Sequence, residues 1–523
     1  MSSFRHVRRV ICSAVQMLLV AIAVTSATVS VTGAASGPAP GAPGVHCADP
    51  TGSEDFQRLD PTDAKVDPEL LTQLIEWAST RNSSSVRVYR HGCLLGASRM
   101  DALSQDLPAQ WQSTSKSITA LTVGRAEELG FLSLDDPVSK YFPEADTAHG
   151  RILLRHLITQ SGGLRFSLAG DGWNTQMTDG VRIALHQDVV HQPGTYFEYQ
   201  QHGITLLLAC VQRAVGEDVQ DFMQRELFGK LGISRDQWWW NRDRAGWTSG
   251  WWGLYLTPRL MPRFGQLMLA GGLWNGDRIL SERFVHAAGT SNPVNGAYGY
   301  LMWTNQGDNY WTPTIPVRRL IDRPFLPSAP RDTFEFNGFG GQYVYIIPSL
   351  DMVIERSGSN PYRDTDPQTA AGGAFSGDFD WKLFQKLNGA VTDVHWSDPG
   401  PYVTPPGQAP VDTEKALYPE QDLAGLGVGP PAGGCNIVGC DGSIDFSGYD
   451  KQRTEAARYV QGLATRGAVP VSPLIGLFGI PRFPWFAAAP TAARTRQGSR
   501  AGSCAAPSTA TGAAELVQGP SGA

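Results

Sequence analysis

Two β-rich runs at opposite ends of one long stretch constrain the fold more than any other feature of this sequence. The first, VRVYRHGCLLGA, begins at Val86, and the second, QYVYIIPSLDMVIERS, ends at Ser357. The second run turns around Pro348–Asp351, which predicts a hairpin. Between the two runs, segments such as SITALTVGRAEELG and ITLLLACVQRAVG have helical periodicity. We therefore predict an α+β fold, in which N-terminal and C-terminal strands form one antiparallel sheet flanked by helices, beside a mainly helical subregion.

The N-terminal residues have the composition of an export signal. Arg5, Arg8 and Arg9 precede the apolar run VICSAVQMLLVAIAV, and small residues follow that run. An uncleaved membrane anchor is the alternative, but the run is shorter than the ~20 residues that a spanning helix needs. We therefore predict that residues 1–35 are a signal peptide, that the protein is secreted or held in the cell envelope, and that no stable membrane span remains after cleavage.

Composition also divides the rest of the chain into three segments. Residues 36–46 are rich in Pro, Gly and Ala, which is typical of a linker. Residues 47–395 alternate helical and strand patterns, and we predict that they form the folded domain. Pro, Gly, Ala and Thr dominate residues 396–523, so we predict a partly disordered C-terminal extension there.

The seven cysteines are too few for a disulfide-dense scaffold. Two pairings are open, Cys47 with Cys93 and Cys435 with Cys440, and spacing alone does not decide between paired and free thiols. Cys210 lies in the apolar run LLLACV, and we predict that it is a buried thiol.

Charge and motif searches argue against several classes of function. The formal net charge is −6 and no basic stripe is present, so we predict no nucleic-acid partner. The ten histidines include no HExxH motif and no Cys/His pair at zinc spacing. No GxGxxG motif follows a predicted strand. We therefore predict neither a metal ion nor a cofactor.

The segment WQSTSKSITAL, residues 111–121, places three serines around one lysine. Residues three apart on a helix share a face, so only Ser113 can present its hydroxyl alongside Lys116. No other lysine in the chain has a serine three residues before it. A serine at a helix N-terminus and a neighbouring lysine can act as a nucleophile and its base. Taken alone, however, the motif favours an N-capping serine followed by a surface lysine.

Several ordered blocks change that balance in favour of an enzyme. In order along the chain they resemble the serine hydrolases of the β-lactamase and penicillin-binding-protein superfamily. The similarity is greater to the branch that contains class C β-lactamases, D-Ala-D-Ala carboxypeptidases, esterases and 6-aminohexanoate-dimer hydrolases. It extends from about Val86 to Arg356. The blocks are WQSTSKSITALTVGRAEELGFLSLDDPVSKYFPEA, ILLRHLITQSGGL, PGTYFEYQQHGITLLLACVQRAVG, GLYLTPRLMPRFGQLMLAGGLWNGDRIL and GFGGQYVYIIPSLDMVIE.

The resemblance implies an exported serine hydrolase that cleaves small amides or esters through an acyl-enzyme. Ser113 matches the nucleophile, Lys116 its activating partner, and Tyr199, in FEYQQ, the residue that relays protons to and from the leaving group. The backbone N–H groups of Ser113 and Phe339, which follows Gly338, are implied as the oxyanion hole. Whether Lys116 or Tyr199 is the general base stays open.

Two departures from the family pattern bear on the substrate. Gln201 stands where the family commonly has asparagine, and its amide reaches one methylene further. The sequence FEFNGFGGQ replaces the Lys-Thr-Gly or His-x-Gly block, so a substrate carboxylate loses an evident partner. We therefore rank amidase or esterase activity above β-lactamase or D-Ala-D-Ala carboxypeptidase activity, although a peptidoglycan-related substrate stays an alternative.

Gln201 and Gly338 are predicted to bind the substrate, together with residues of the tryptophan-rich segments. Trp173 and Trp252 adjoin glycine-rich loops and are candidate pocket walls, and Asp171 is a candidate partner for a substrate ammonium. Trp238–Trp240 are expected to fill the core instead.

Two other classes of function stay in competition with this hypothesis. A conventional Ser-His-Asp hydrolase is disfavoured because no G-x-S-x-G motif is present. A non-catalytic cell-envelope binding protein on the same fold would account for the departures at Gln201 and in FEFNGFGGQ. Retention of Ser113, Lys116 and Tyr199 together argues against it.

Overall fold

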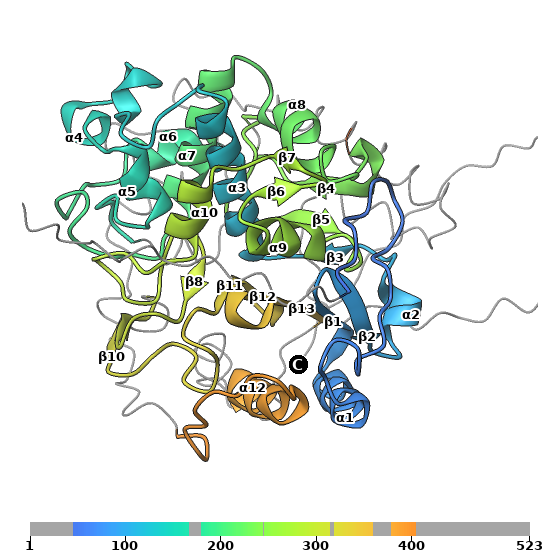
Figure 1. Cartoon of the computed structure of the whole chain (residues 1–523). Helices are drawn as coiled ribbons and strands as arrows, with labels where there is room; N and C mark the ends of the chain where they lie inside the picture. The colour runs from blue at the N-terminus through green and yellow to red at the C-terminus, as the bar shows by residue number, and fades with distance from the viewer. Residues whose placement is uncertain are drawn as a thin grey trace, which may run out of the picture. The chain divides into compact units, whose positions relative to one another are not determined.

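The fold is described from a computed structural model of the chain (Figure 1). The predicted signal peptide, Trp173, Asp171 and the Cys435–Cys440 pair lie outside the described residues, as does most of the predicted C-terminal extension. The structure describes residues 45–166, 179–243, 245–313, 318–358, 378–403 and 455.

A six-stranded antiparallel sheet lies at the centre, in the order β2-β1-β13-β12-β11-β8. Strand β1 pairs with β13 along most of its length, and Arg90 lies opposite Met352 at one end of the register. The early and late β-rich runs therefore join in one sheet, as predicted. The strands are β1 (Ser83–Arg90), β2 (Cys93–Ala97), β8 (Trp303–Thr304), β11 (Phe334–Gly338), β12 (Gln342–Ile347) and β13 (Met352–Gly358).

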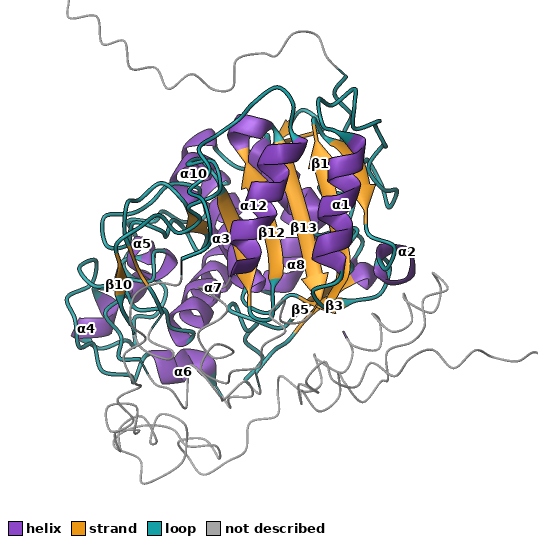
Figure 2. Cartoon of the chain, turned by 90° about the horizontal axis from the view of Figure 1, so that it is seen from below, coloured by secondary structure: helices purple, strands orange, loops and turns teal. Residues whose placement is uncertain are grey.

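Helices cover both faces of this sheet. On one face lie α1 (Pro68–Ser79) and α12 (Asp378–Ala390), which Figure 2 shows side by side in front of the strands. Tyr345 of β12 faces α12, where its ring meets Phe384 edge to face at 5.3 Å. Val344 points the opposite way, toward α9 (Pro262–Leu269), because side chains alternate along a strand.

The predicted helical subregion is present beside the sheet, around α3 (Thr114–Glu128) and α7 (His202–Val215). Short helices, turns and two- or three-residue strands complete this part of the molecule. The helices are α2 (Asp101–Ser104), α4 (Thr147–Gly150), α5 (Leu154–Ile158), α6 (Gly180–Ala184), α8 (Val219–Met223) and α10 (Glu282–Ala288), with the helical turns η1 (Val138–Lys140), η3 (Gln224–Phe228), η4 (Arg235–Gln237) and η5 (Pro348–Leu350). The strands are β3 (Ala109–Gln110), β4 (Trp238–Trp240), β5 (Leu254–Leu256), β6 (Leu273–Trp274), β7 (Asp277–Arg278), β9 (Tyr310–Trp311) and β10 (Leu320–Ile321).

Helix α3 is buried on every side from Thr114 to Ala126, unlike an amphipathic surface helix. Two of its hydroxyl side chains donate to backbone carbonyls of surrounding loops. Thr119 Oγ1 donates to Gly250 O over 2.7 Å, and Ser117 Oγ donates to Leu301 O over 2.9 Å. The helix therefore holds loops from distant parts of the sequence around one axis.

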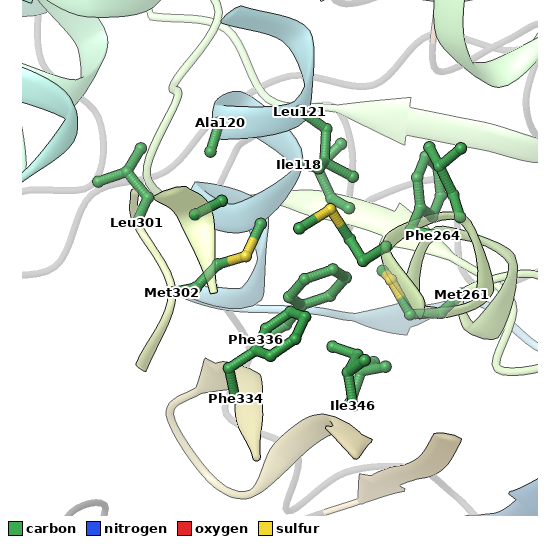
Figure 3. Packing of buried hydrophobic residues seen from close by; sticks show 14 of the residues in the cluster. Ile118, Ala120, Leu121, Met261, Phe264, Leu301, Met302, Phe334, Phe336 and Ile346 are labelled. Carbon is green, nitrogen blue, oxygen red and sulfur yellow. The ribbon is translucent and has the colours of Figure 1, made fainter. Parts of the chain in front are cut away.

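Apolar side chains lock α3 between the sheet and α9 (Figure 3). Ile118 and Leu121 of α3 pack in one cluster with Phe264 of α9 and Phe336 of β11, all fully buried. Truncating one such side chain to alanine typically costs about 2–5 kcal/mol. The position of α3 against β11 is thus set by a large buried area.

The structure also shows the state of the cysteines in its described ranges. Cys47 and Cys93 form a disulfide with a Cα–Cα distance of 5.1 Å, and Cys210 is a buried free thiol.

Packing continues past residue 395, since the indole N–H of Trp396 donates to Ser328 O over 2.6 Å. In the part of the chain that the structure describes, every helix is too short or too polar to cross a membrane.

Candidate active site

Ser113 is the N-cap residue of α3, and its side chain makes no capping hydrogen bond. The chain turns sharply just before it, because Gln112 has a left-handed φ of 47°. Trp111 anchors this turn: its backbone N–H donates to Leu254 O and its buried indole N–H to Leu256 O, each over 2.9 Å. The turn presents Ser113 half-buried at the start of a helix that is buried from Thr114 to Ala126.

Lys116 lies one turn along α3 and is 1% exposed. Its Nζ atom is 3.1 Å from Ser113 Oγ and 3.2 Å from the carbonyl oxygen of Trp251. The same nitrogen lies 4.6 Å from the centre of the Tyr199 ring. The structure therefore brings together the three residues that the sequence predicted to be catalytic, with Nζ directed at the serine hydroxyl.

Tyr199 is buried and hydrogen-bonded to Ser113. Burial raises the pKa of Tyr199 well above its ordinary value of 10.0, and the hydrogen bond with Ser113 opposes this shift only in part. The ring stacks on Trp303 at 5.9 Å and meets Tyr298 edge to face at 6.2 Å. These contacts hold a protonated phenol beside the serine at neutral pH.

Gln160, which sequence reasoning missed, holds the segment that carries Tyr199. Its side-chain Nε2 donates to Gln200 O over 3.0 Å, and its Oε1 accepts from Gln200 N over 3.1 Å. The amide thus replaces a missing strand neighbour for the residue after Tyr199. The signal in the sequence is the segment ILLRHLITQSGGL, in which Gln160 precedes Ser161.

The end of β11 lies against the start of α3. A Cβ atom on Gly338 would lie 2.5 Å from Trp111 O and 2.9 Å from Thr114 Oγ1, so the approach requires glycine. Thr114 Oγ1 also donates to Gln342 O over 2.8 Å, which ties the β11–β12 turn to the helix. Phe339 lies in that turn with 58% of its surface exposed. The oxyanion hole formed by the N–H groups of Ser113 and Phe339 stays a prediction.

Arg356 of β13 is hydrogen-bonded to the same β11–β12 turn. Its Nη1 donates to the carbonyl of Gly341, and its Nη2 donates to Arg81 O over 2.6 Å. Gly340 and Gly341 both have left-handed φ values, 79° and 82°, which suit glycine. A buried guanidinium therefore stabilises the tight turn that follows Phe339.

The other predicted site residues lie at different distances from Ser113 and Lys116, and some are part of the core. Gln201 is buried at the N-cap of α7, next to the segment held by Gln160. Trp252 is buried, whereas its neighbour Trp251 is half-buried and approaches Lys116 with both its carbonyl and its ring, 5.4 Å from Nζ. Trp252 as a wall of the substrate pocket stays a prediction, and Trp251, which the sequence did not single out, is the tryptophan of this pair that contacts the lysine. Trp238–Trp240 fill the core as expected.

The residues described here supply the groups needed for acyl transfer: a nucleophile, an amine, a phenol and backbone donors at a helix N-terminus. Within the described ranges, no group of three or more His, Cys, Asp and Glu side chains is arranged to hold a metal ion. The chemistry that this arrangement offers is nucleophilic attack by a hydroxyl with proton transfer through an amine and a phenol.

A family model described as Beta-lactamase matches residues 71–371. An uncharacterised protein from Alkalihalophilus pseudofirmus is 23% identical over 284 residues, which are 50% of this chain and 76% of that protein. The 6-aminohexanoate-dimer hydrolase of Paenarthrobacter ureafaciens is 24% identical over 273 residues, 48% of this chain and 66% of the hydrolase. Monacolin J acid methylbutanoyltransferase of Aspergillus terreus is 24% identical over 164 residues, 26% of this chain and 39% of the transferase.

Solved structures give similarities of the same kind. A penicillin-binding protein homologue from Pyrococcus abyssi has a TM-score of 0.41 and 18% identity, covering 58% of this chain and 75% of that one. The D-alanine carboxypeptidase from Burkholderia cenocepacia has a TM-score of 0.41 and 18% identity, covering 59% of this chain and 98% of that one.

Proposed function

Because the chain belongs to the Beta-lactamase family, whose model matches residues 71–371, we propose that it is an exported serine hydrolase that cleaves small amides or esters through an acyl-enzyme on Ser113. One observation carries the proposal: Lys116 Nζ lies 3.1 Å from Ser113 Oγ, while Tyr199 hydrogen-bonds to the same serine. A surface lysine beside a capping serine would be exposed, whereas Lys116 is enclosed.

In the acylation step, Ser113 Oγ attacks the substrate carbonyl carbon while its proton passes to the uncharged amine of Lys116. The backbone N–H groups of Ser113 and Phe339 donate to the oxygen that becomes negative. The bond from the carbonyl carbon to the leaving nitrogen or oxygen then breaks, the leaving group takes a proton from Tyr199, and Tyr199 recovers a proton from Lys116. In deacylation, water attacks the acyl carbon, its proton returns through the same pair, and Ser113 leaves as a hydroxyl.

The general base is assigned to Lys116 because of the environment of Tyr199. A phenolate base would require Tyr199 to lose its proton near neutral pH, yet burial raises the pKa of this tyrosine well above 10.0. A protonated Tyr199 suits a relay to the leaving group. This consideration supports one of the two roles that the sequence left open.

Neutral amides and esters are proposed as substrates because β11 carries no cation. The residues of β11 are FEFNG, and its two polar side chains, Glu335 and Asn337, are buried. They are hydrogen-bonded to each other, with Asn337 Nδ2 donating to Glu335 Oε1 over 2.5 Å. A substrate carboxylate would find no positive partner on this strand. Export to the cell surface or medium rests on the arginine-led apolar run of residues 1–35.

The test is intact-mass analysis after reaction with a fluorophosphonate probe. We expect one adduct on the wild type and on Ser115→Ala, a matched control on the same helix, and none on Ser113→Ala. Esters, short amides, D-amino-acid peptides and a β-lactam would then be screened as substrates. A folded wild type that takes no adduct would overturn the proposal in favour of a non-catalytic binding protein.

A further inference from the structure

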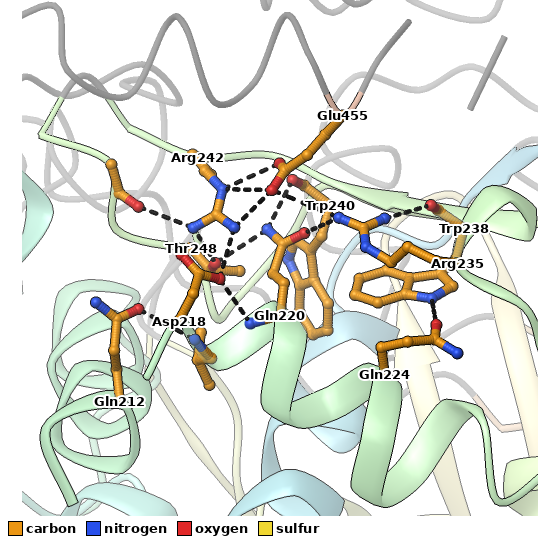
Figure 4. A network of polar contacts seen from close by, with 12 residues as sticks. Gln212, Asp218, Gln220, Gln224, Arg235, Trp238, Trp240, Arg242, Thr248 and Glu455 are labelled. Atoms are coloured by element: carbon orange, nitrogen blue, oxygen red, sulfur yellow. Dashed lines mark hydrogen bonds and ion pairs between the residues drawn. The ribbon is translucent and has the colours of Figure 1, made fainter. Parts of the chain in front are cut away.

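A buried ionic pocket lies away from Ser113, between α8, η4 and the segment that follows β4 (Figure 4). Arg242 forms its centre, with a side chain that is 1% exposed. Asp218, the N-cap residue of α8, accepts from Arg242 Nη2 over 2.8 Å. Arg235 of η4 lies on the other side, with a side chain that is 14% exposed. All three residues belong to the folded domain.

The second carboxylate in this pocket comes from Glu455, far along the predicted C-terminal extension. Arg242 Nε donates to both Glu455 oxygens, over 3.1 and 3.0 Å, and Arg242 Nη2 donates to Oε1 over 2.6 Å. Arg235 Nη2 lies 3.4 Å from the same Oε1. Glu455 is itself 8% exposed. Two guanidinium groups therefore enclose one carboxylate from a segment 213 residues distant.

The charges of the pocket favour a carboxylate at the position that Glu455 occupies. Asp218 supplies one negative charge to Arg242, and Glu455 supplies a second that Arg242 and Arg235 share. Burial by itself would lower the pKa of Arg242, and the contacts with Glu455 and Asp218 raise it above its ordinary value instead. A buried guanidinium that loses a carboxylate partner is strongly disfavoured, so the pocket is complementary to an acidic side chain.

The pocket also touches the loop that reaches the candidate active site. Arg242 Nη1 donates to Gly246 O over 3.0 Å, at the base of the tryptophan loop, which we define as residues 245–253. Further along this loop, Trp251 O accepts from Lys116 Nζ. The guanidinium that binds Glu455 thus also holds one end of a loop whose other end contacts the lysine.

We propose that the Arg235/Arg242 pocket is the docking site of the C-terminal extension on the folded domain, with Glu455 as the anchoring side chain, and that docking restrains the tryptophan loop. The extension is therefore a bound part of the protein at this point and not only a tether. The proposal does not depend on hydrolysis at Ser113.

Hydrogen–deuterium exchange on the full-length protein tests it directly. Glu455→Gln is expected to raise exchange in peptides covering residues 241–253 by roughly an order of magnitude, because a buried charge pair is lost. Glu420→Gln, a glutamate of the same extension, is the matched control and is expected to leave these peptides unchanged. Equal exchange in the wild type and Glu455→Gln would overturn the proposal.

A double-mutant cycle provides a second readout. Arg235→Gln and Glu455→Gln are each expected to lower the melting temperature, and the double variant is expected to lose less than the sum, because the two side chains share one interaction. Strictly additive losses would contradict contact between them. A coupling that rises with protein concentration, with dimers in sedimentation, would assign the carboxylate to a second copy and overturn docking within one chain.

Discussion

Gln160 and Gln200 lie 40 residues apart in sequence and exchange two hydrogen bonds, in which the side-chain amide of the first pairs with the backbone of the second. A side chain thus performs the task of a neighbouring strand. Because Gln200 directly follows Tyr199, these two hydrogen bonds fix the position of the Tyr199 backbone.

Gln160→Glu removes the donor to Gln200 O but keeps the acceptor and the size of the side chain. We expect turnover to fall by roughly 10- to 100-fold, since displacement of a catalytic group by about 1 Å is enough for such a loss. Steady-state kinetics on a substrate from the screen measures this. Gln187→Glu, which places a carboxyl at another buried glutamine, is the control. Equal losses in the two variants would mean that Gln160 has no positioning role.

Tyr199→Phe separates leaving-group protonation from nucleophilic attack. An amide needs a proton on its departing nitrogen, whereas p-nitrophenolate leaves without one. We expect the variant to lose about 10²- to 10⁴-fold in amide hydrolysis while p-nitrophenyl ester acylation falls much less. Burst kinetics with both substrates provides the comparison. Loss to the same extent on both would assign Tyr199 to activation of Ser113 instead.

Gly338→Ala tests the close approach of β11 to α3. The new methyl group would meet Trp111 O at 2.5 Å, so the strand end must shift, at a typical cost of about 1–3 kcal/mol. We expect slower fluorophosphonate labelling of Ser113, because the Phe339 N–H moves with the turn. Gly389→Ala in α12 is the control, since no atom lies within 4 Å of the added carbon. That control is expected to stabilise the protein by about 0.5–1 kcal/mol. Unchanged labelling in Gly338→Ala would show that the turn does not take part.

The buried carboxyl of Glu355 predicts that stability falls as pH rises from about 4.5 to about 8. Burial raises the pKa of Glu355 from 4.5 to about 8, although Ser85 donates to its Oε2 over 2.8 Å. The folded state therefore keeps a proton that the unfolded chain releases, and the free energy of unfolding falls as pH rises from about 4.5 to about 8. The glutamine in Glu355→Gln cannot ionise. We expect the free energy of unfolding of this variant to equal that of the wild type near pH 4 and to exceed it by a few kcal/mol near pH 9, because each unit of pKa shift is worth ~1.4 kcal/mol.

Urea unfolding across this pH range measures the difference between the two proteins. Glu226→Gln is a control at a carboxyl whose pKa is shifted downward instead of upward. Burial alone would raise the pKa of Glu226, but hydrogen bonds from Arg125 and Arg225 lower it below 4.5. Its carboxylate therefore stabilises the fold at neutral pH, and its replacement is expected to cost stability there. A Glu355→Gln difference that does not vary with pH would contradict the shift.

Local patterns determined a large part of this protein in advance. Ser113 and Lys116 lie on one helix face because the three-residue spacing dictates it once the helix forms. Alternation and turn residues were enough for the late hairpin, and the ordered blocks indicated a superfamily that the Beta-lactamase family match confirms, together with the α+β fold. These features depend on neighbours in sequence or on recurring motifs, both of which a single chain displays.

Tertiary structure alone decided the contacts that join distant segments. The pairing of Gln160 with Gln200, the choice of Trp251 over Trp252 beside Lys116, and the seat of Glu455 on Arg242 each select one partner among many of similar chemistry. Burial around Tyr199 likewise sets its protonation, and no spacing rule reports burial. Sequence periodicity specifies which face a residue occupies, whereas long-range partners and local dielectric arise only when the whole core has packed.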